Sequence, residues 1–428
     1  MSELRFALAF LLAAAPIRAD GPDWSRRLEA AIERATTRNP EVAEREARIE
    51  ASRHRIGQAT ALPDPEIDVG LQDVPVPRFS LSRSDFTMEK VAASQRFPAA
   101  GKRPAQKRSA EAEFESASAM HADHVIRIAA EVADAFFSIA DIDTRMHILE
   151  ASRERLKRAA ESAAERYRVG KGVQADVLRA NLEVTATEER LASLVGERRM
   201  RAAQFNALQA LPPSTPIDPI AIPENDPTPP ASAQLLRDAE ATSPAVSAAQ
   251  AQVRVADEQR TLAHLERRPD LTATGYYAHR IDFDDFVGAS VGLNLPFFQP
   301  KRLREREAEK ESELSGARAS LEMVKNEIRR AIEEAYADFE RSIEQVRLYR
   351  GSILPQAETN AKAAQEAYTV GQIDFLTYVR AALDLDSYEA ELSMRRAGAW
   401  RAVAALQKAS GLALIAGTPT TGEIHAQN

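Results

Sequence analysis

Two copies of one short motif decide the fold: Ala164-Glu165-Arg166-Tyr167-Arg168-Val169-Gly170, and later Ala367-Tyr368-Thr369-Val370-Gly371. Each copy ends a stretch with helical periodicity and is followed by another such stretch. Glycine readily adopts the left-handed conformation that ends a helix. The motifs therefore predict two tight helical hairpins, with turns at residues 169–173 and 370–374.

The motifs belong to a longer internal repeat. Residues 149–211 and 350–412 superpose without a gap at a shift of 201 residues, with identities such as Ala163/Ala364. A unit of about 200 residues is too long for a solenoid repeat and indicates a duplication. We assign the first copy to residues 20–211 and the second to 231–414. Residues 212–230 form a proline-rich linker, and residues 415–428 are expected to be a flexible C-terminal tail.

The helical part of each copy is unusually long. The 65 residues from Ala105 to Val169 contain no glycine or proline. As a continuous helix they would extend roughly 100 Å, which exceeds a globular domain. The apolar stripe near the end, from Leu149 to Tyr167, is narrow and typical of coiled coils. We expect helices packed side by side into a wall, and the aromatic content of 6% predicts a core without aromatic packing.

Four stretches with period two predict β-strands, at about residues 65–73, 86–97, 270–280 and 285–296. In the clearest of them, Val287 and Val291 alternate with the small or polar Gly288 and Ser290. Strands of about 9 to 12 residues cross a bilayer when tilted, with apolar residues toward lipid. The alternative is a small soluble sheet packed on the helices. Four strands cannot close around a pore, so a membrane role requires several copies of the chain.

The remaining composition excludes several functions. Arg5 followed by the apolar run Phe6–Ala15 predicts a signal peptide at residues 1–19. The chain has no cysteine, which excludes disulfides and thiolate chemistry. A net charge of −8 argues against nucleic acid as a partner. No arrangement of catalytic, metal-binding or cofactor-binding residues recurs in the two copies, so we expect neither an enzyme nor a bound cofactor.

Two local patterns have competing interpretations. His121 and His124 with Asp123 have a spacing that suits a metal, but no third ligand is near in sequence, which favours solvated helix residues. Lys102-Arg103 and Lys301-Arg302 follow the predicted strands. They either anchor at lipid headgroups or solvate the start of a helix.

The order of these features resembles the TolC-like outer-membrane efflux family over about residues 24–414. The stretches that carry the resemblance are Thr37–Glu41, Gln95–Pro98 with Gly101–Arg103, and the two Tyr-x-Val-Gly motifs. The resemblance implies a mainly α protein with a small transmembrane β part. It implies a homotrimer in which an α-helical barrel continues into a 12-stranded β-barrel, with four strands from each chain.

The resemblance also implies the cellular location and the partner proteins. The barrel would lie in the lipid of the bacterial outer membrane, and the helical tunnel in the periplasm. Conduction would be passive, driven by an inner-membrane RND-type pump through a periplasmic adaptor (membrane fusion) protein. The hairpin turns would dock on this adaptor. The residues assigned to docking are Tyr167, Val169, Gly170, Lys171, Tyr368, Val370, Gly371 and Gln372.

One departure from the family concerns the periplasmic gate. Members often carry acidic residues six and nine positions after the turn glycine of the second copy, which is Gly371 here. This chain has Thr377 and Arg380 at those positions. The first copy has Asp176 and Arg179, and Asp374 lies nearer the second turn. We therefore hypothesise a gate held by pairs of arginine and aspartate.

The shortness of the chain and the stretch from Phe97 to Arg103 are similar to the heavy-metal efflux branch. The expected cargo is metal cations or small toxic compounds. Three rival functions are each less consistent with the sequence. A periplasmic adaptor usually has one hairpin flanked by lipoyl-like segments, a soluble coiled-coil scaffold lacks period-two stretches, and a hydrolase needs a catalytic constellation.

Overall fold

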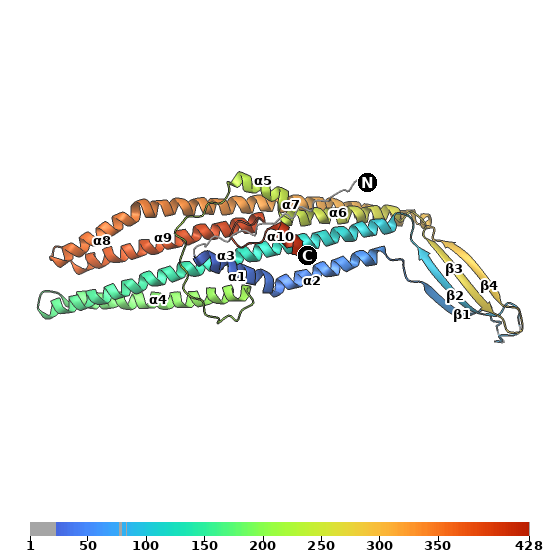
Figure 1. Ribbon diagram of the computed structural model, residues 1–428, viewed down its shortest axis with the longest axis horizontal. Helices are drawn as coiled ribbons and strands as arrows, with labels where there is room; N and C mark the ends of the chain where they lie inside the picture. The colour runs from blue at the N-terminus through green and yellow to red at the C-terminus, as the bar shows by residue number, and fades with distance from the viewer. Residues whose placement is uncertain (1–22, 77–78, 83, 428) are drawn as a thin grey trace, which may run out of the picture.

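The computed structural model describes residues 23–76, 79–82 and 84–427, so the predicted signal peptide lies outside the described residues. Long helices run side by side and lead to a small sheet at one end of an elongated molecule (Figure 1). The elements are α1 (Asp23–Arg38), α2 (Pro40–Thr60), β1 (Glu66–Gln72), β2 (Met88–Phe97), α3 (Lys102–Arg168), α4 (Gln174–Leu208), α5 (Ser232–Thr242), α6 (Pro244–Leu265), β3 (Leu271–His279), β4 (Phe286–Leu293), η1 (Pro296–Phe298), α7 (Pro300–Leu348), η2 (Tyr349–Ile353), α8 (Leu354–Thr369), α9 (Phe375–Ser410) and α10 (Thr421–Gln427).

The helices form a wall in which each lies beside the next. Helix α3 packs against α2 and α4 on one side and against α6 and α9 on the other, and α7 packs against α6 and α9. Helices α2 and α4 follow one another along α3, and α6 and α9 do the same (Figure 1). The order across the wall is therefore α2 with α4, then α3, then α6 with α9, then α7. The predicted mainly α fold with a small β part is confirmed.

Helix α3 is a single helix of 67 residues that contains the whole run without glycine or proline up to Arg168; Pro104 lies in its first turn, where proline is tolerated. At 1.5 Å per residue it is about 100 Å long. Among the helices that the structure describes, none combines the length and apolar character needed to cross a membrane.

The corresponding path in the second half is interrupted. Helix α7 passes into the π-helical turn η2, and α8 continues from there with Pro355 in its first turn. Proline has no N–H to donate to the preceding turn, and a π turn widens the ring of backbone hydrogen bonds. The second half therefore contains a local irregularity in a helix that is regular in the first half.

The four strands form one antiparallel sheet in the order β1-β2-β3-β4. Val69, Val91, Tyr277 and Val287 oppose one another in a single row across it. This face is apolar and exposed, with Val69 77% and Val287 84% exposed. The alternation predicted from the sequence thus gives the sheet one apolar face.

The other face of the sheet is polar and more covered. The Tyr276 ring lies so close to Gly288 that a Cβ atom there would clash with it. On the same face, Lys90 Nζ lies 4.6 Å from the centroid of the Tyr276 ring. A side chain at position 288 would therefore force the Tyr276 ring to move from its place across the two strands.

The main core lies in the middle of the wall, where α1 covers α3. Phe137 stacks on Trp400 with centroids 5.2 Å apart, and Trp24 meets the same Trp400 ring edge-on at 5.2 Å. Phe136 lies edge-on to Phe137 at 5.5 Å. The expectation of a core without aromatic packing was wrong, because the few aromatic side chains are concentrated at this one place.

The linker and the C-terminal segment complete this core. Ile220 of the linker is buried, and its N–H donates to Asp143 at 2.9 Å. Ile415 and Ile424 are buried in the same cluster. The buried amide oxygen of Gln407 accepts hydrogen bonds from the N–H groups of residues 414 and 415. The expectation of a flexible tail at residues 415–428 was therefore wrong for the segment up to residue 424, because its isoleucines and backbone are held by the wall.

Replacing Phe137 by alanine should lower the free energy of unfolding by about 3 to 5 kcal/mol, because it removes a fully buried ring from a close-packed core. The measurement is denaturant unfolding of the purified protein in detergent. Met200→Ala is the matched control, since Met200 is 68% exposed on α4 and its loss should change stability by less than about 0.5 kcal/mol. Equal effects of the two substitutions would contradict the core described here.

Candidate functional site

The two hairpin tips share one backbone geometry. Gly170 and Gly371 have φ angles of 71° and 79°, which L residues rarely adopt. At the first tip the Lys171 N–H donates to the Arg166 carbonyl at 2.8 Å, and the Gln372 N–H makes the same bond to residue 367 at the second. The glycine N–H groups donate to carbonyls three residues earlier, at 3.0 Å for Gly170 and 3.1 Å for Gly371, and the two bonds together define a Schellman motif at each tip. The turns lie where the motifs placed them.

The tips also expose apolar side chains. Val169 is 65% exposed and Val370 is 70% exposed, each beside the turn glycine. Lys171 and Gln372 are exposed next to them. The two tips thus present the same kind of exposed aliphatic side chain at matching places.

One aromatic side chain joins the two hairpins. The Arg166 guanidinium lies 4.8 Å from the centroid of the Tyr368 ring and donates to the Tyr368 carbonyl at 3.3 Å. Tyr368 also stacks on Tyr378 at 5.2 Å and meets Phe375 edge-on at 5.7 Å. Tyr167, its counterpart in the first hairpin, is half exposed. Tyr368 therefore lies in the contact between the hairpins, whereas Tyr167 does not.

Arg166, Phe375 and Tyr378 were not predicted as site residues from the sequence. The two copies differ at these places, since Arg166 corresponds to alanine at 367 and Tyr378 to valine at 177. Most aligned positions of the two copies differ, however, so this difference alone did not identify the contact between the hairpins.

Inside one chain the five gate candidates form no ion pair between an arginine and an aspartate. The Asp374 carboxylate accepts a hydrogen bond from the Thr377 N–H at 2.7 Å and caps α9. Hydrogen bonds from the Thr377 hydroxyl and from its N–H, together with the nearby charge of Arg380, lower the pKa of Asp374. Arg179 instead pairs with Glu183 on its own helix at 3.2 Å. Asp176 lies in the first turn of α4. An arginine–aspartate gate would therefore require pairs between chains.

A buried ion pair links the hairpins further from the tips. Asp386 of α9 is only 5% exposed and pairs with Arg155 of α3. Burial raises the pKa of Asp386, although Ser152 and Arg155 hydrogen-bond to it. Burial and the neighbouring Asp386 also raise the pKa of Glu389. Removing Arg155 while Asp386 stays buried would leave a desolvated carboxylate without its partner, which is costly.

A continuous groove runs along the face of the wall opposite the main core. Four cavities of about 740, 640, 740 and 580 Å³ follow one another from the base of the strands toward the hairpins. Neighbouring cavities share lining residues, namely Gln259, then Asp123, then Asp338. We call this the long groove. On α3 its lining residues recur every three or four positions, on the side opposite Val125 and Ala129 of the core.

The groove begins at a joint between sheet and helices. The buried Asp270 carboxylate, just before β3, accepts hydrogen bonds from Arg96 Nη2 at 2.6 Å, Lys102 Nζ at 2.7 Å and the Ala99 N–H at 2.8 Å. Burial alone would raise the pKa of Asp270, but these three donors lower it to about 2. The carboxylate thus ties β2, β3 and the start of α3 together.

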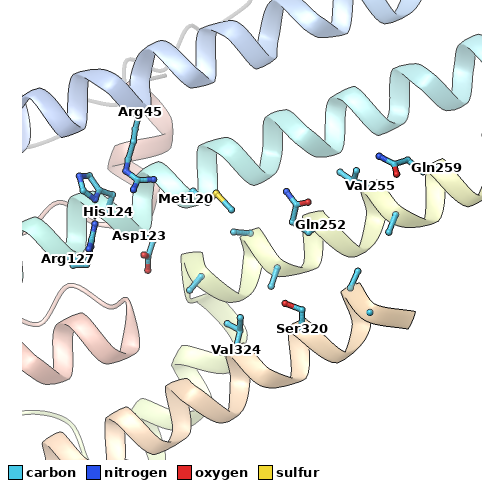
Figure 2. A pocket seen from close by; sticks show the side chains of 16 residues that line it. Arg45, Met120, Asp123, His124, Arg127, Gln252, Val255, Gln259, Ser320 and Val324 are labelled. Atoms are coloured by element: carbon cyan, nitrogen blue, oxygen red, sulfur yellow. Dashed lines mark hydrogen bonds between the residues drawn. The ribbon is translucent and has the colours of Figure 1, made fainter. Parts of the chain in front are cut away.

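In the middle of the groove a buried histidine lies among charged side chains (Figure 2). His124 is 1% exposed, and its Nε2 atom lies 3.3 Å from Glu41 of α2. Burial, with the charges of Arg45 and Arg127, lowers the pKa of His124 to about 4. Burial raises the pKa of the adjacent Asp123 carboxylate, which points into the groove. The imidazole is therefore neutral at pH 7.

The expectation that His121 and His124 are solvated was wrong, since they are 4% and 1% exposed. Helix α2 packs against α3 and Glu41 reaches the imidazole, a contact that local sequence does not show. Within the part of the chain that the structure describes, no three histidine, aspartate or glutamate side chains gather as metal ligands. Two guanidinium groups beside His124 would in any case repel a cation.

A wall of long helices with a charge-lined groove, continuing into a sheet with one apolar face, defines a channel-forming protein. The sequence model of the outer membrane efflux protein family matches residues 31–211 and 235–412, which is well over half of the chain. The chain therefore belongs to the outer membrane efflux protein family.

Individual relatives agree with this assignment. The chain is 28% identical over 341 residues to protein CyaE of Bordetella pertussis, covering 76% of this chain and 71% of CyaE. The outer membrane protein VceC of Vibrio cholerae has a similar fold, with a TM-score of 0.77, 18% identity and coverage of 91% of this chain and 98% of VceC. The MtrE outer membrane channel of Neisseria gonorrhoeae, solved in its open state, gives a TM-score of 0.69 at 16% identity, covering 92% and 91%.

The family assignment confirms several predictions. Its members are TolC-like outer-membrane channels with a helical tunnel in the periplasm, and they are transport proteins rather than enzymes. TolC-like proteins act as trimers with adaptors and inner-membrane pumps. The similarity to the heavy-metal branch stays a prediction.

His124 should make stability fall as the pH decreases from about 6.5 to about 4. Its pKa in the folded chain, about 4, lies below the ordinary value, so the unfolded chain binds the proton first. The stabilisation is complete above pH 6.5 and decreases by about 3 kcal/mol per chain on acidification. His124→Gln should flatten this pH dependence in denaturant unfolding. The exposed His54→Gln should retain it, and identical profiles for the two variants would refute the assignment.

Proposed function

We propose that three copies of this chain assemble into one outer-membrane duct that conducts exported compounds passively. The observation that carries this proposal is the position of the open edges. Strand β1 and helices α2 and α4 lie at one side of the chain, and strand β4 and helix α7 lie at the other. Sheet and wall are therefore incomplete on the same two sides, and one more chain can complete both at once.

Closure of the sheet needs several chains. The outer edges of β1 and β4 have no partner strand within the sheet. Open edges are not tolerated in lipid, so β1 of one chain would pair with β4 of the next. Three chains with four strands each would give a ring of twelve strands. The exposed apolar face, which includes Val291 at 67% exposure, would contact outer-membrane lipid.

The tips would dock on the periplasmic adaptor. Support comes from the matching Schellman geometry of the two turns and from the exposed Val169 and Val370. Tyr167, Lys171, Gly371 and Gln372 would extend this contact. The adaptor would connect the duct to an RND-type pump, which supplies the energy.

The closed tip would be held by contacts within and between chains. Within a chain, the Arg166 guanidinium contacts the ring and the carbonyl of Tyr368 in the other hairpin, and we call this contact the clamp. Between chains, Asp176 and Asp374 would meet Arg179 or Arg380 of the neighbour, since these residues form no pairs with each other inside one chain. Adaptor binding would break both sets of contacts and let the tips separate.

The rival functions have less support. A periplasmic adaptor or a soluble scaffold would not need a four-stranded sheet with an exposed apolar face. Of the cargo classes expected from the resemblance, metal cations and small toxic compounds, the family match selects neither.

The mature chain, extracted from the outer membrane in detergent, should have the mass of three chains. Chemical cross-linking followed by light scattering measures this, and the cross-linked ladder should end at three. Heating before electrophoresis should convert the trimer band to a monomer band. A mature chain that is monomeric and dissolves without detergent would overturn the proposal.

Loss of the clamp between the hairpins should open the tip. Arg166→Ala and, independently, Arg380→Ala should raise the single-channel conductance in planar bilayers several-fold, because each removes a contact that holds the closed state. Arg168→Ala is the matched control, since Arg168 pairs only with Glu165 of its own helix at 2.9 Å. Unchanged conductance in Arg166→Ala would remove the clamp from the proposal, and unchanged conductance in Arg380→Ala would remove the gate between chains.

A further inference from the structure

The cavity at the base of the strands has an unbalanced charge. It has a volume of about 740 Å³, and six cationic side chains but only two carboxylates line it. We call the six cationic side chains the basic collar. They are Arg96, Lys102, Arg268, Arg302, Arg306 and Lys310.

The collar faces the long groove and not the lipid side of the sheet. Arg96 lies in a row with Thr272 and Gly292, on the polar face opposite Val291. The collar's cavity and the next one along the groove both include Gln259. On α3, Lys102 lies five helical turns before Met120 and on the same side. The collar therefore lines the end of the long groove where the strands meet the helices.

The two carboxylates do not neutralise the collar. Asp270 already accepts hydrogen bonds from Arg96 and Lys102, and Glu266 pairs with Arg306 at 3.2 Å. Lys310 pairs with Glu313 at 2.7 Å and Glu309 at 3.5 Å, both outside the cavity lining, so Arg268 and Arg302 are the two collar members left over. Arg268 donates to the neutral carbonyl of residue 100 at 2.8 Å. Arg302 is exposed, and neither it nor Arg268 pairs with a carboxylate among the described residues. Each chain thus contributes guanidinium groups that are available to a passing anion.

We propose that the basic collar binds anionic groups of the exported compound, so that the cargo of this duct is small molecules bearing carboxylate, phosphate or sulfonate groups. This inference rests on the proposed function, because three collars surround one passage only in the trimer. Guanidinium groups match such oxyanions with two parallel hydrogen bonds. A narrow passage lined by one sign of charge concentrates ions of the opposite sign and repels bare metal cations. The expected cargo class of metal cations is therefore disfavoured.

The same oxyanion chemistry occurs in phospholipid headgroups, which are the alternative ligand for Lys301 and Arg302. The position of the collar on the polar face argues for the exported compound. Bilayers made only of zwitterionic phosphatidylcholine remove anionic lipid from the measurement, and the ligand is then supplied from solution.

The test uses the purified trimer in such bilayers, with inorganic tripolyphosphate added on the side of the strands, so that it reaches the collar without passing the tips. Tripolyphosphate should block the wild-type current in a concentration-dependent manner and less strongly in 1 M salt. The double variant Arg302→Gln/Arg306→Gln should raise the half-blocking concentration about tenfold. The matched control Lys301→Gln/Arg304→Gln removes the same charge from the same helix, but at residues outside the cavity lining. Tripolyphosphate should block this variant at the same concentration as the wild type.

The outcomes separate the two proposals. Absence of any channel current would overturn the proposed function itself. Channels that tripolyphosphate does not block, or equal block of the two double variants, would overturn the collar's role while leaving the duct intact. Block by the polycation spermine instead would also overturn it. If the Arg302→Gln/Arg306→Gln variant changes only insertion into bilayers containing anionic lipid, with block unchanged, the collar binds headgroups and the inference is wrong.

Discussion

The backbone N–H and C=O groups on the outer edges of β1 and β4 have no partner strand in the sheet of this chain, and hydrocarbon offers none. Each unsatisfied group in lipid costs several kcal/mol, which no side-chain packing on one chain removes. The helical wall is open on the same sides, at α2 with α4 and at α7. In the proposed trimer, the tunnel, the shared passage and the six tips all depend on satisfying these edges with neighbouring chains.

The regular parts of the fold could be predicted from the sequence because their signals are local. Period-two alternation around Val287 gave a strand at 285–296, where the structure has β4 at Phe286–Leu293. The glycine-free and proline-free run gave the single long helix α3. The aromatic core could not be predicted, because Trp24 and Trp400 come from opposite ends of the chain. The aromatic content of a sequence gives the number of such residues but not which of them are in contact in the fold.

The candidate site divides in the same way. The turns at Gly170 and Gly371 could be predicted because a left-handed glycine is a local requirement. The contact of Arg166 with Tyr368 joins residues 202 positions apart, and it appears in the sequence only as a departure from the repeat. The burial of His124 depends on α2, which packs across α3 from another part of the chain. The sequence showed that Lys102 and Arg302 are cationic residues next to the strands. It did not show that both line the same cavity.

The π turn at Tyr349–Ile353 makes the two hairpins mechanically different. Lys102 and Gly170 are 68 positions apart, whereas Lys301 and Gly371 are 70 apart, so the second path has additional residues to place along the same wall. A wider turn followed by a proline accommodates extra length, and such a point bends more easily than an unbroken helix. In an assembled duct of three chains, the three second hairpins would then move while the three first hairpins stay in place. The opening at the tips would widen with threefold rather than sixfold symmetry.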